Sequence, residues 1–207
     1  MPGEPISPDD LRGFNQRLIQ ALEKLGLVYA IGGSVAAMAY SEPRVTIDID
    51  VMLDAKPSDL KRLVDEVSAW QIYISPFETI LETSIPHGLP FNVIDGTIGV
   101  KADFYVAKPA GLDASALARR RRMKLDRQTG SEAWFLSPED VILYKLSYYR
   151  QTGEISQKHP IDISKMLAVI GRTWIWLTLN GGPQSLEWLT SGRHSAMNFD
   201  RSDLTTL

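Results

Sequence analysis

The sequence predicts an α+β fold, in which a small mixed sheet is flanked by helices and followed by a helical C-terminal lobe. Two observations lead to this fold class. Short β-rich segments alternate with helical stretches in the first part of the chain, whereas helix signals dominate after residue 131. The chain has 207 residues, of which 44% are hydrophobic, so it can bury a sizeable core. We expect one domain over residues 1–130 and a helical lobe over residues 131–207.

Helical periodicity predicts two helices that flank the sheet. The first begins at Ser7-Pro8, which is a typical helix start, and the second covers residues 58–70. In both segments apolar residues recur every three or four positions, so one side of each helix should be buried. These positions are Leu11, Phe14, Leu18, Leu22 and Leu25 in the first helix, and Leu60, Leu63, Val64, Val67 and Trp70 in the second.

The segment around the first predicted strand has the order strand, glycine turn, helix, strand. Residues 27–31 form a short buried strand, Gly32-Gly33 permits a tight turn, and residues 34–40 are small enough for a closely packed helix. Free N–H groups at a helix start can hold phosphate, so Gly32, Gly33 and Ser34 are candidates for binding a triphosphate. An isolated Gly-Gly-Ser can also be only a turn with an N-cap.

Two acids follow on the next predicted strand. In an extended strand Asp48 and Asp50 share one face, while Ile47, Ile49 and Val51 share the other, apolar face. Carboxylates on Cα atoms about 6.6 Å apart can approach to roughly 4 Å, where they repel by about 4 kcal/mol. A pair of divalent ions, Mg²⁺ or Mn²⁺, would relieve this repulsion. The alternative is a half-buried strand whose acids face water.

A two-metal site usually needs a third acid, and Asp103 is the best candidate. It lies in the β-rich segment 98–106, which we expect to pair as a hairpin with residues 91–94. Asp95 competes for the role, but Asp95-Gly96 is a strong turn signal, so we assign Asp95 to the hairpin turn. Asp54 and Asp113 are expected in loops.

The chain resembles the DNA polymerase beta type nucleotidyltransferase superfamily in three motifs. These are Gly32-Gly33-Ser34, Arg44-x-Thr46-x-Asp48-x-Asp50, and an aspartate on a later strand, Asp103. Within this superfamily the chain most resembles the small bacterial nucleotidyltransferases that include the AbiEii/AbiGii abortive-infection toxins. The similarity covers roughly residues 25–170, including the helix start Ser137-Pro138 and a downstream segment with Asp162. Many relatives carry Gly just before the Arg-x-Thr stretch, where this chain has Ser41-Glu42-Pro43.

The resemblance implies roles for individual residues. Residues 1–130 would be the catalytic domain, in which Asp48 and Asp50 bind both metal ions and Asp103 binds the catalytic ion. Arg44 and Lys145 would join Gly32, Gly33 and Ser34 in binding the nucleotide. Arg44 could instead pair with Glu42, and Lys145 could be a solvent-facing lysine on an amphipathic helix.

The C-terminal part of the chain supplies helices and an aromatic cluster. Helices are expected from Ser137-Pro138 onward and over residues 160–170. A cluster of Trp174, Trp176, Leu177 and Trp188 should close the helical lobe, since such aromatics are more often core than a base-stacking surface.

Composition excludes several classes of site. The sequence has no Cys and only three scattered His, which excludes disulfides and thiolate sites and makes a His-rich zinc site improbable. It has no apolar run long enough to span a membrane and no signal-peptide pattern at its start, so we expect a cytoplasmic protein without a membrane partner.

The basic run Arg119–Arg122, with Lys124 and Arg127, is the main indication of an acceptor. It could contact RNA phosphates, or it could be a solvated helix end or pair with nearby acids. The leading hypothesis is a nucleotidyltransferase that transfers a nucleoside monophosphate from an NTP to tRNA or another RNA, as a toxin with a protein antitoxin. Alternatives are an enzyme that modifies a small molecule such as an antibiotic, and a non-catalytic nucleotide-binding module.

Overall fold

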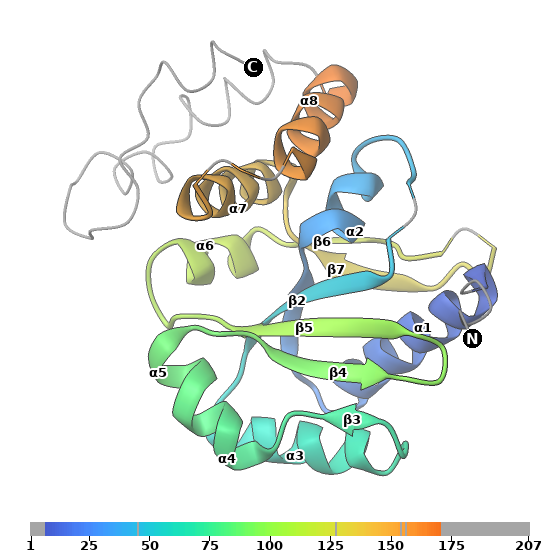
Figure 1. Cartoon of the computed structure of the whole chain (residues 1–207), viewed down its shortest axis with the longest axis vertical. Helices are drawn as coiled ribbons and strands as arrows, with labels where there is room; N and C mark the ends of the chain where they lie inside the picture. The colour runs from blue at the N-terminus through green and yellow to red at the C-terminus, as the bar shows by residue number, and fades with distance from the viewer. Residues whose placement is uncertain (1–6, 45, 127, 154, 156, 171–207) are drawn as a thin grey trace. The chain divides into compact units, whose positions relative to one another are not determined.

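The computed structural model describes residues 7–44, 46–126, 128–153, 155 and 157–170, which form two compact units (Figure 1). Unit 1 contains Met1–Val35 and Val45–Leu136, and unit 2 contains Ala36–Arg44 and Ser137–Leu207. The sequence placed the division at residues 130 and 131. That domain division stays a prediction, and unit 1 continues to Leu136 because residues 132–135 form a strand of its sheet.

Unit 1 is built on a seven-stranded mixed sheet with the strand order β3-β4-β5-β2-β1-β7-β6. β2 pairs in parallel with β5, and β1 pairs in parallel with β7, whereas the other neighbours are antiparallel. The predicted mixed sheet flanked by helices is therefore confirmed. The strands are β1 (Val28–Ile31), β2 (Asp48–Asp54), β3 (Tyr73–Ile74), β4 (Phe91–Asp95), β5 (Val100–Val106), β6 (Arg121–Lys124) and β7 (Glu132–Phe135).

The predicted hairpin is formed by β4 and β5, and Asp95, the last residue of β4, stands directly before its turn. Asp95 Oδ1 accepts hydrogen bonds from the backbone N–H of Thr97, at 3.0 Å, and from the Thr97 hydroxyl. The hydrogen bond from the Thr97 side chain is the main reason why the pKa of Asp95 lies below its usual value. On the buried face of the hairpin the rings of Phe91 and Phe104 stack with centroids 5.0 Å apart.

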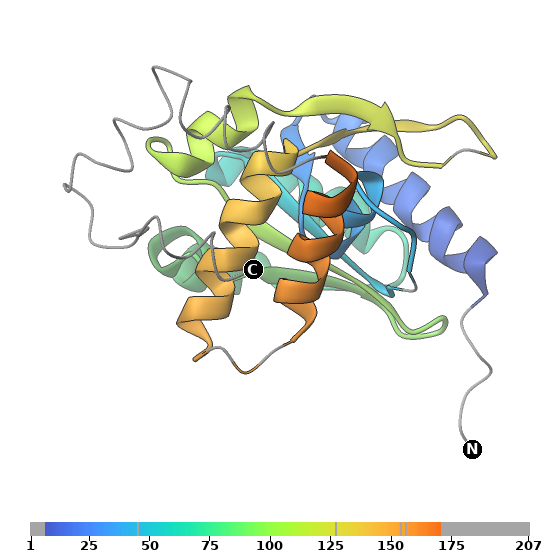
Figure 2. The same ribbon diagram turned by 90° about the horizontal axis from the view of Figure 1, so that it is seen from above.

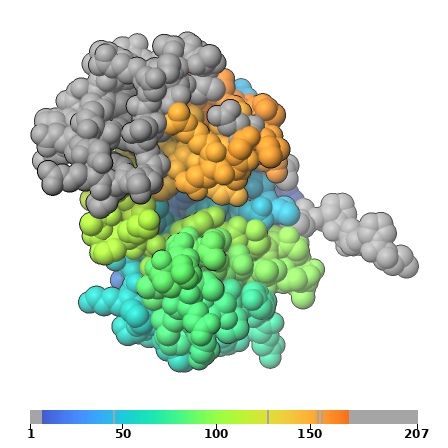
Figure 3. Space-filling model, turned by 60° about the vertical axis from the view of Figure 1, so that its left-hand side comes forward, coloured from blue at the N-terminus to red at the C-terminus, as the bar shows by residue number. Residues whose placement is uncertain are grey.

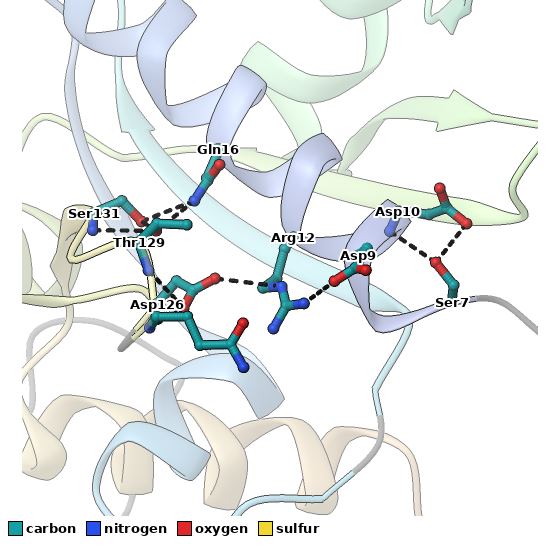
Figure 4. A network of polar contacts seen from close by, with 9 residues as sticks. Ser7, Asp9, Asp10, Arg12, Gln16, Asp126, Thr129 and Ser131 are labelled. Atoms are coloured by element: carbon teal, nitrogen blue, oxygen red, sulfur yellow. Dashed lines mark hydrogen bonds and ion pairs between the residues drawn. The ribbon is translucent and has the colours of Figure 1, made fainter.

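Helix α1 (Pro8–Lys24) begins where the sequence predicts. The Ser7 hydroxyl accepts a hydrogen bond from the backbone N–H of Asp10 at 3.1 Å, which caps the first turn. Figure 4 shows two further contacts on this helix: Arg12 pairs with Asp126, and Gln16 reaches the hydroxyl groups that follow β6. Its buried residues are Phe14, Leu18, Ile19, Ala21 and Leu22, a stripe that matches the predicted one except at its two ends.

The predicted second helix is α3 (Pro57–Ser68), which buries Leu60, Leu63 and Val67. After β3 the chain makes a helical segment that the sequence analysis missed, in which a π-helix, η1 (Ile80–Ser84), separates α4 (Phe77–Thr79) from α5 (Ile85–His87). The green atoms of this region lie on the surface of unit 1 in Figure 3. Helix α6 (Leu112–Ala118), which contacts β1 and β2, was also not predicted.

Unit 2 contains two neighbouring helices, α7 (Pro138–Gln151) and α8 (Lys158–Ile170), which lie side by side in both Figure 1 and Figure 2. Ser137 caps α7 by accepting a hydrogen bond from the backbone N–H of Asp140 at 3.3 Å. The predicted cluster of Trp174, Trp176, Leu177 and Trp188 lies outside the described residues. Over the residues that the structure describes, no helix has both the length and the apolar character that crossing a membrane requires.

Candidate active site

The pairing of β2 with β5 brings the predicted acids together. In the parallel register Asp50 is the partner of Asp103, and Asp48 is the partner of Lys101. Side chains at paired positions of neighbouring strands point to the same side of a sheet, so these four side chains share one face. The residues that alternate with them along the two strands, Ile49, Val51, Ala102 and Phe104, are buried on the opposite face. We call the four residues Asp48, Asp50, Lys101 and Asp103 the carboxylate face.

The alternation predicted for β2 holds from Asp48 to Val51 but not before Asp48. Ile49 and Val51 are buried as expected, whereas Ile47 is 41% exposed, because β2 begins only at Asp48. Neighbouring strands lie about 4.8 Å apart and alternate residues along a strand about 6.6 Å apart. The four Cα atoms of the carboxylate face therefore occupy the corners of a small rectangle, with three carboxylates and one ammonium above it.

Asp103 is oriented by two neighbours within unit 1. The amide of Asn92, its register partner on β4, donates a short hydrogen bond to Oδ1. The ammonium of Lys101 lies 2.8 Å from Oδ2. Both carboxylate oxygens are thus engaged, and the side chain is held on the same side of the sheet as Asp50.

Lys101 is a charged residue of the site that the sequence analysis overlooked. The hydrogen bond to Asp103 is the main cause that raises the pKa of Lys101, burial acts in the opposite direction, and the charges of Asp103, Asp48 and Asp50 raise it further. All three predicted acids therefore act on one cation. The signal was present in the sequence, since Lys101 stands two residues before Asp103 on a predicted strand.

The glycine turn lies directly against β2. The backbone N–H of Gly32 donates to the carbonyl of Asp50 at 2.8 Å, and Gly33 begins α2 (Gly33–Ala39) with φ +56°. A Cβ atom built on Gly33 would overlap the carboxylate of Asp50 and lie 2.9 Å from its Cβ. Ser34 follows in the first turn of α2 and is half-buried. Gly32, Gly33, Ser34 and the carboxylate face thus belong to one region of unit 1.

The donor set of this face suits a hard divalent cation. Carboxylate oxygens are the ligands that Mg²⁺ and Mn²⁺ prefer. The carboxylates of this face already hold one cation, the ammonium of Lys101, which pairs with Asp103. Among the described residues, no three His, Cys, Asp or Glu side chains are arranged closely enough to hold an ion as they stand. The residues therefore fit a divalent ion in chemistry and charge, but Asp103 is turned to Lys101 and Asn92.

Arg44 and Lys145, the other predicted nucleotide-binding residues, lie in unit 2 and contact the same side chain, Asp162. Arg44 forms two hydrogen bonds of 3.1 Å to its carboxylate, and Lys145 donates to Oδ2 at 2.8 Å. Lys145 is only 5% exposed, so it is not the solvent-facing lysine that was considered as an alternative. Arg44 therefore has an ion-pair partner other than the neighbouring Glu42 that was considered as an alternative.

Asp162 is 4% exposed and remains ionised because of these two cations. Burial acts to raise the pKa of Asp162, but the hydrogen bonds and charges of Arg44 and Lys145 outweigh it, so the pKa lies below its usual value. Burial and the charge of Lys145 also lower the pKa of the neighbouring His159. Arg44 and Lys145 thus both stabilise the buried carboxylate of Asp162. That they also bind nucleotide stays a prediction.

The basic run extends from the end of a helix into an edge strand: Arg119 is the C-cap of α6, and Arg121 and Arg122 lie on β6. Arg120 precedes β6, and its guanidinium lies 4.7 Å from the ring centroid of Trp134, while that of Arg122 lies 5.6 Å from the same ring. Arg122 also pairs with Glu23 and Glu132. The contacts of Arg122 match the alternative of pairing with nearby acids, whereas Arg120 contacts the Trp134 ring and donates to the backbone carbonyl of Leu117.

Comparison with solved structures shows that the chain has the fold of nucleotidyltransferases. The antibiotic-resistance factor ANT(2'')-Ia is similar over 80% of this chain and 86% of its own, with 17% identity and a TM-score of 0.58. The lincomycin-bound lincosamide antibiotic adenylyltransferase LnuA is similar over 80% of this chain and 99% of its own, with 11% identity and a TM-score of 0.54.

A third similar structure is an antigenic nucleotidyltransferase-like protein from Paracoccidioides brasiliensis, with 19% identity and a TM-score of 0.50. The similarity covers 80% of this chain and 78% of that protein. No protein-family model matches the chain, and no curated protein matches it. At these identities the similarity establishes the fold, and the chemistry has to be argued from the residues.

Proposed function

We propose that the chain is a nucleotidyltransferase that moves a nucleoside monophosphate from an NTP to a hydroxyl group of an acceptor. The observation that carries this proposal is the register of β2 and β5, which places Asp50 beside Asp103 on one face of the sheet. The turn at Gly33 lies against the same carboxylate. The nucleotidyltransferase fold of the similar structures supports it independently.

The proposed reaction forms one bond and breaks one. The acceptor oxygen attacks the α-phosphorus of the NTP, and the bond from that phosphorus to the oxygen that bridges to the β-phosphate breaks, which releases pyrophosphate. Two divalent ions, Mg²⁺ or Mn²⁺, would neutralise phosphate charge and make the acceptor hydroxyl easier to deprotonate.

The residues of this chain would have distinct tasks. Asp48, Asp50 and Asp103 would hold the ions, and Asn92 would keep the Asp103 carboxylate in place. The backbone around Gly32 and Gly33 and the hydroxyl of Ser34 would contact the triphosphate, because glycine lets phosphate approach the backbone closely. Arg44 and Lys145 remain proposed nucleotide-binding residues.

Two observations favour a small hydroxylated molecule as the acceptor. ANT(2'')-Ia was solved with adenylyl-2"-tobramycin, at 16% identity and a TM-score of 0.58, and LnuA was solved with lincomycin. In addition, two arginines of the basic run have partners within unit 1: Arg120 contacts the ring of Trp134, and Arg122 pairs with Glu23. Transfer to tRNA or another RNA, as a toxin with an antitoxin, is the second candidate, and the basic run Arg119–Arg122 would be its contact.

The test is a transfer assay with α-labelled NTPs. The full-length protein is incubated with Mg²⁺ and each NTP in turn, in separate reactions that contain aminoglycosides, lincosamides or total tRNA, and the labelled product is identified. Asp50→Asn should abolish labelling. Asp54→Asn is the matched control, because Asp54 lies at the exposed end of the same strand and should leave transfer unchanged.

The outcomes separate the hypotheses. Label on a drug supports the small-molecule acceptor, and label on tRNA supports the RNA acceptor. NTP binding without any labelled product would favour the non-catalytic module. Equal transfer by Asp50→Asn and the wild-type protein would reject the proposed site.

A further inference from the structure

Lys101 occupies a position on the carboxylate face that a metal ion would also need. Its ammonium lies 2.8 Å from Oδ2 of Asp103, and its Cα is the register partner of Asp48. An oxygen that accepts a charge-assisted hydrogen bond at this distance is a poor ligand for a metal ion until the ammonium leaves. Lys101 therefore competes for at least one of the proposed ligand atoms.

Lys101 can leave its position at little cost. The side chain is 37% exposed, whereas that of Asp103 is 14% exposed. A lysine ammonium is a compact charge on a flexible stem, and exposed ion pairs of this kind are weak. A divalent ion carries twice the charge and binds carboxylate oxygens directly, so it should displace the ammonium from Asp103.

We propose that Lys101 is a built-in counter-ion that neutralises the carboxylate face when no metal is bound and is displaced from Asp103 when a divalent ion binds. This inference rests on the proposed function, because it assumes that the ion binds at Asp48, Asp50 and Asp103. Lys101 thereby lowers the affinity for the metal and keeps three neighbouring carboxylates from repelling one another in the metal-free protein.

A different role for Lys101 would give a different result. If the contact with Asp103 were only a surface ion pair, removal of Lys101 would change stability slightly and leave metal binding unaffected. If Lys101 instead contacted the triphosphate, its removal would weaken nucleotide binding and leave metal affinity without nucleotide unaffected. Metal binding measured without nucleotide therefore distinguishes the proposal from both.

The experiment measures Mn²⁺ binding to the full-length protein by calorimetry and by electron paramagnetic resonance, without nucleotide. Lys101→Met should bind Mn²⁺ roughly two- to fivefold more tightly than the wild-type protein, which is the effect of losing one partly exposed ion pair. Lys108→Met is the matched control. Lys108 follows β5 roughly 20 Å further along the chain, so its charge is screened from the carboxylate face.

A second measurement follows the ammonium itself. In amine-selective NMR spectra, the signal that Lys101→Met removes should shift when Mg²⁺ is added, and the Lys108 signal should not. A second variant, Lys101→Gln, should bind Mn²⁺ as tightly as Lys101→Met. A circular dichroism spectrum of each variant shows whether the substitution has disturbed the fold.

The outcomes distinguish this inference from the proposed function. Tighter Mn²⁺ binding by Lys101→Met and a shifted Lys101 signal support it. Mn²⁺ binding that Asp50→Asn abolishes but Lys101→Met leaves unchanged or weakens would overturn this inference alone. Absence of binding, or binding that survives Asp50→Asn, would overturn the proposed metal site and this inference with it.

Discussion

Gly33 leaves no room for a side chain, because the carboxylate of Asp50 lies where its Cβ would be. The same glycine has φ +56°, a conformation that other residues adopt only at a cost. Two separate constraints therefore require glycine at this position. The first depends on a tertiary contact with β2, and the second on the local backbone.

Gly33→Ala should abolish nucleotidyl transfer and destabilise the protein by more than the backbone strain alone. Gly26→Ala isolates that strain, since Gly26 has φ +68° and nothing within 4 Å of a built Cβ. We expect Gly26→Ala to cost about 1 to 2 kcal/mol and to keep transfer activity. Urea unfolding and the transfer assay provide the comparison. Similar behaviour of the two variants would argue against a close contact between Gly33 and Asp50.

Asn92→Ala should lower kcat roughly tenfold while changing KM for the NTP little, because the variant releases Oδ1 of Asp103 without altering the phosphate-binding turn. Thr97→Val, in the turn of the same hairpin, is the control and should keep kcat. Steady-state kinetics with saturating metal would measure both parameters. A rise in KM with unchanged kcat would place Asn92 in substrate binding instead.

Lys145→Met should destabilise unit 2 by about 2 to 4 kcal/mol, because it leaves the buried Asp162 with Arg44 as its remaining cation. Lys158→Met is the control, since Lys158 is exposed at the start of α8. Chemical unfolding reports the stability difference. A stable Lys145→Met variant that binds NTP weakly would instead support the predicted contact with nucleotide.

The stability of unit 2 should fall in acid because of Asp162. Its pKa in the folded protein lies below the ordinary value of 3.8, so the folded state binds this proton less readily than the unfolded chain. The carboxylate therefore contributes its full stabilisation above about pH 4 and loses it as the pH falls through the lowered pKa. Asp162→Asn should lack this part of the pH dependence.

Thermal unfolding of the wild-type protein and Asp162→Asn between pH 7 and pH 3 would test this prediction. The variant is expected to be less stable at pH 7, and the difference should shrink toward pH 3. A difference that stays constant over this range would mean that the Asp162 carboxyl has the same pKa in both states.

Elements with a clear local signal were predicted well. The capped and periodic segments at Ser7 and Ser137 became α1 and α7, and the turn at Asp95 joins β4 to β5. These signals depend on neighbours in the sequence, such as a hydroxyl three residues before a backbone N–H. Alternation likewise predicted the shared face of Asp48 and Asp50.

Elements and contacts that depend on residues far apart in the sequence were missed or assigned differently in the sequence analysis. β6 is short and basic, and it is a strand because it pairs with β7, where Trp134 lies beneath Arg120 and Arg122. The partner of Arg44 is Asp162, far along the chain, and not the nearby Glu42. Local patterns cannot supply such partners, because the pairing depends on which elements the fold brings together.

The sequence by itself determined which side chains could share a face of a strand, because successive side chains of a strand point to opposite faces. Asp48 and Asp50 are two residues apart, and Asp103 alternates with apolar neighbours on its own strand. Only the tertiary structure decided that β5 lies beside β2 with Asp103 at the level of Asp50, that Lys101 joins them, and that Gly33 touches the same carboxylate. The physical reason is that strand register follows from the packing of the whole buried face, including Ile49 and Phe104, and not from the acids themselves.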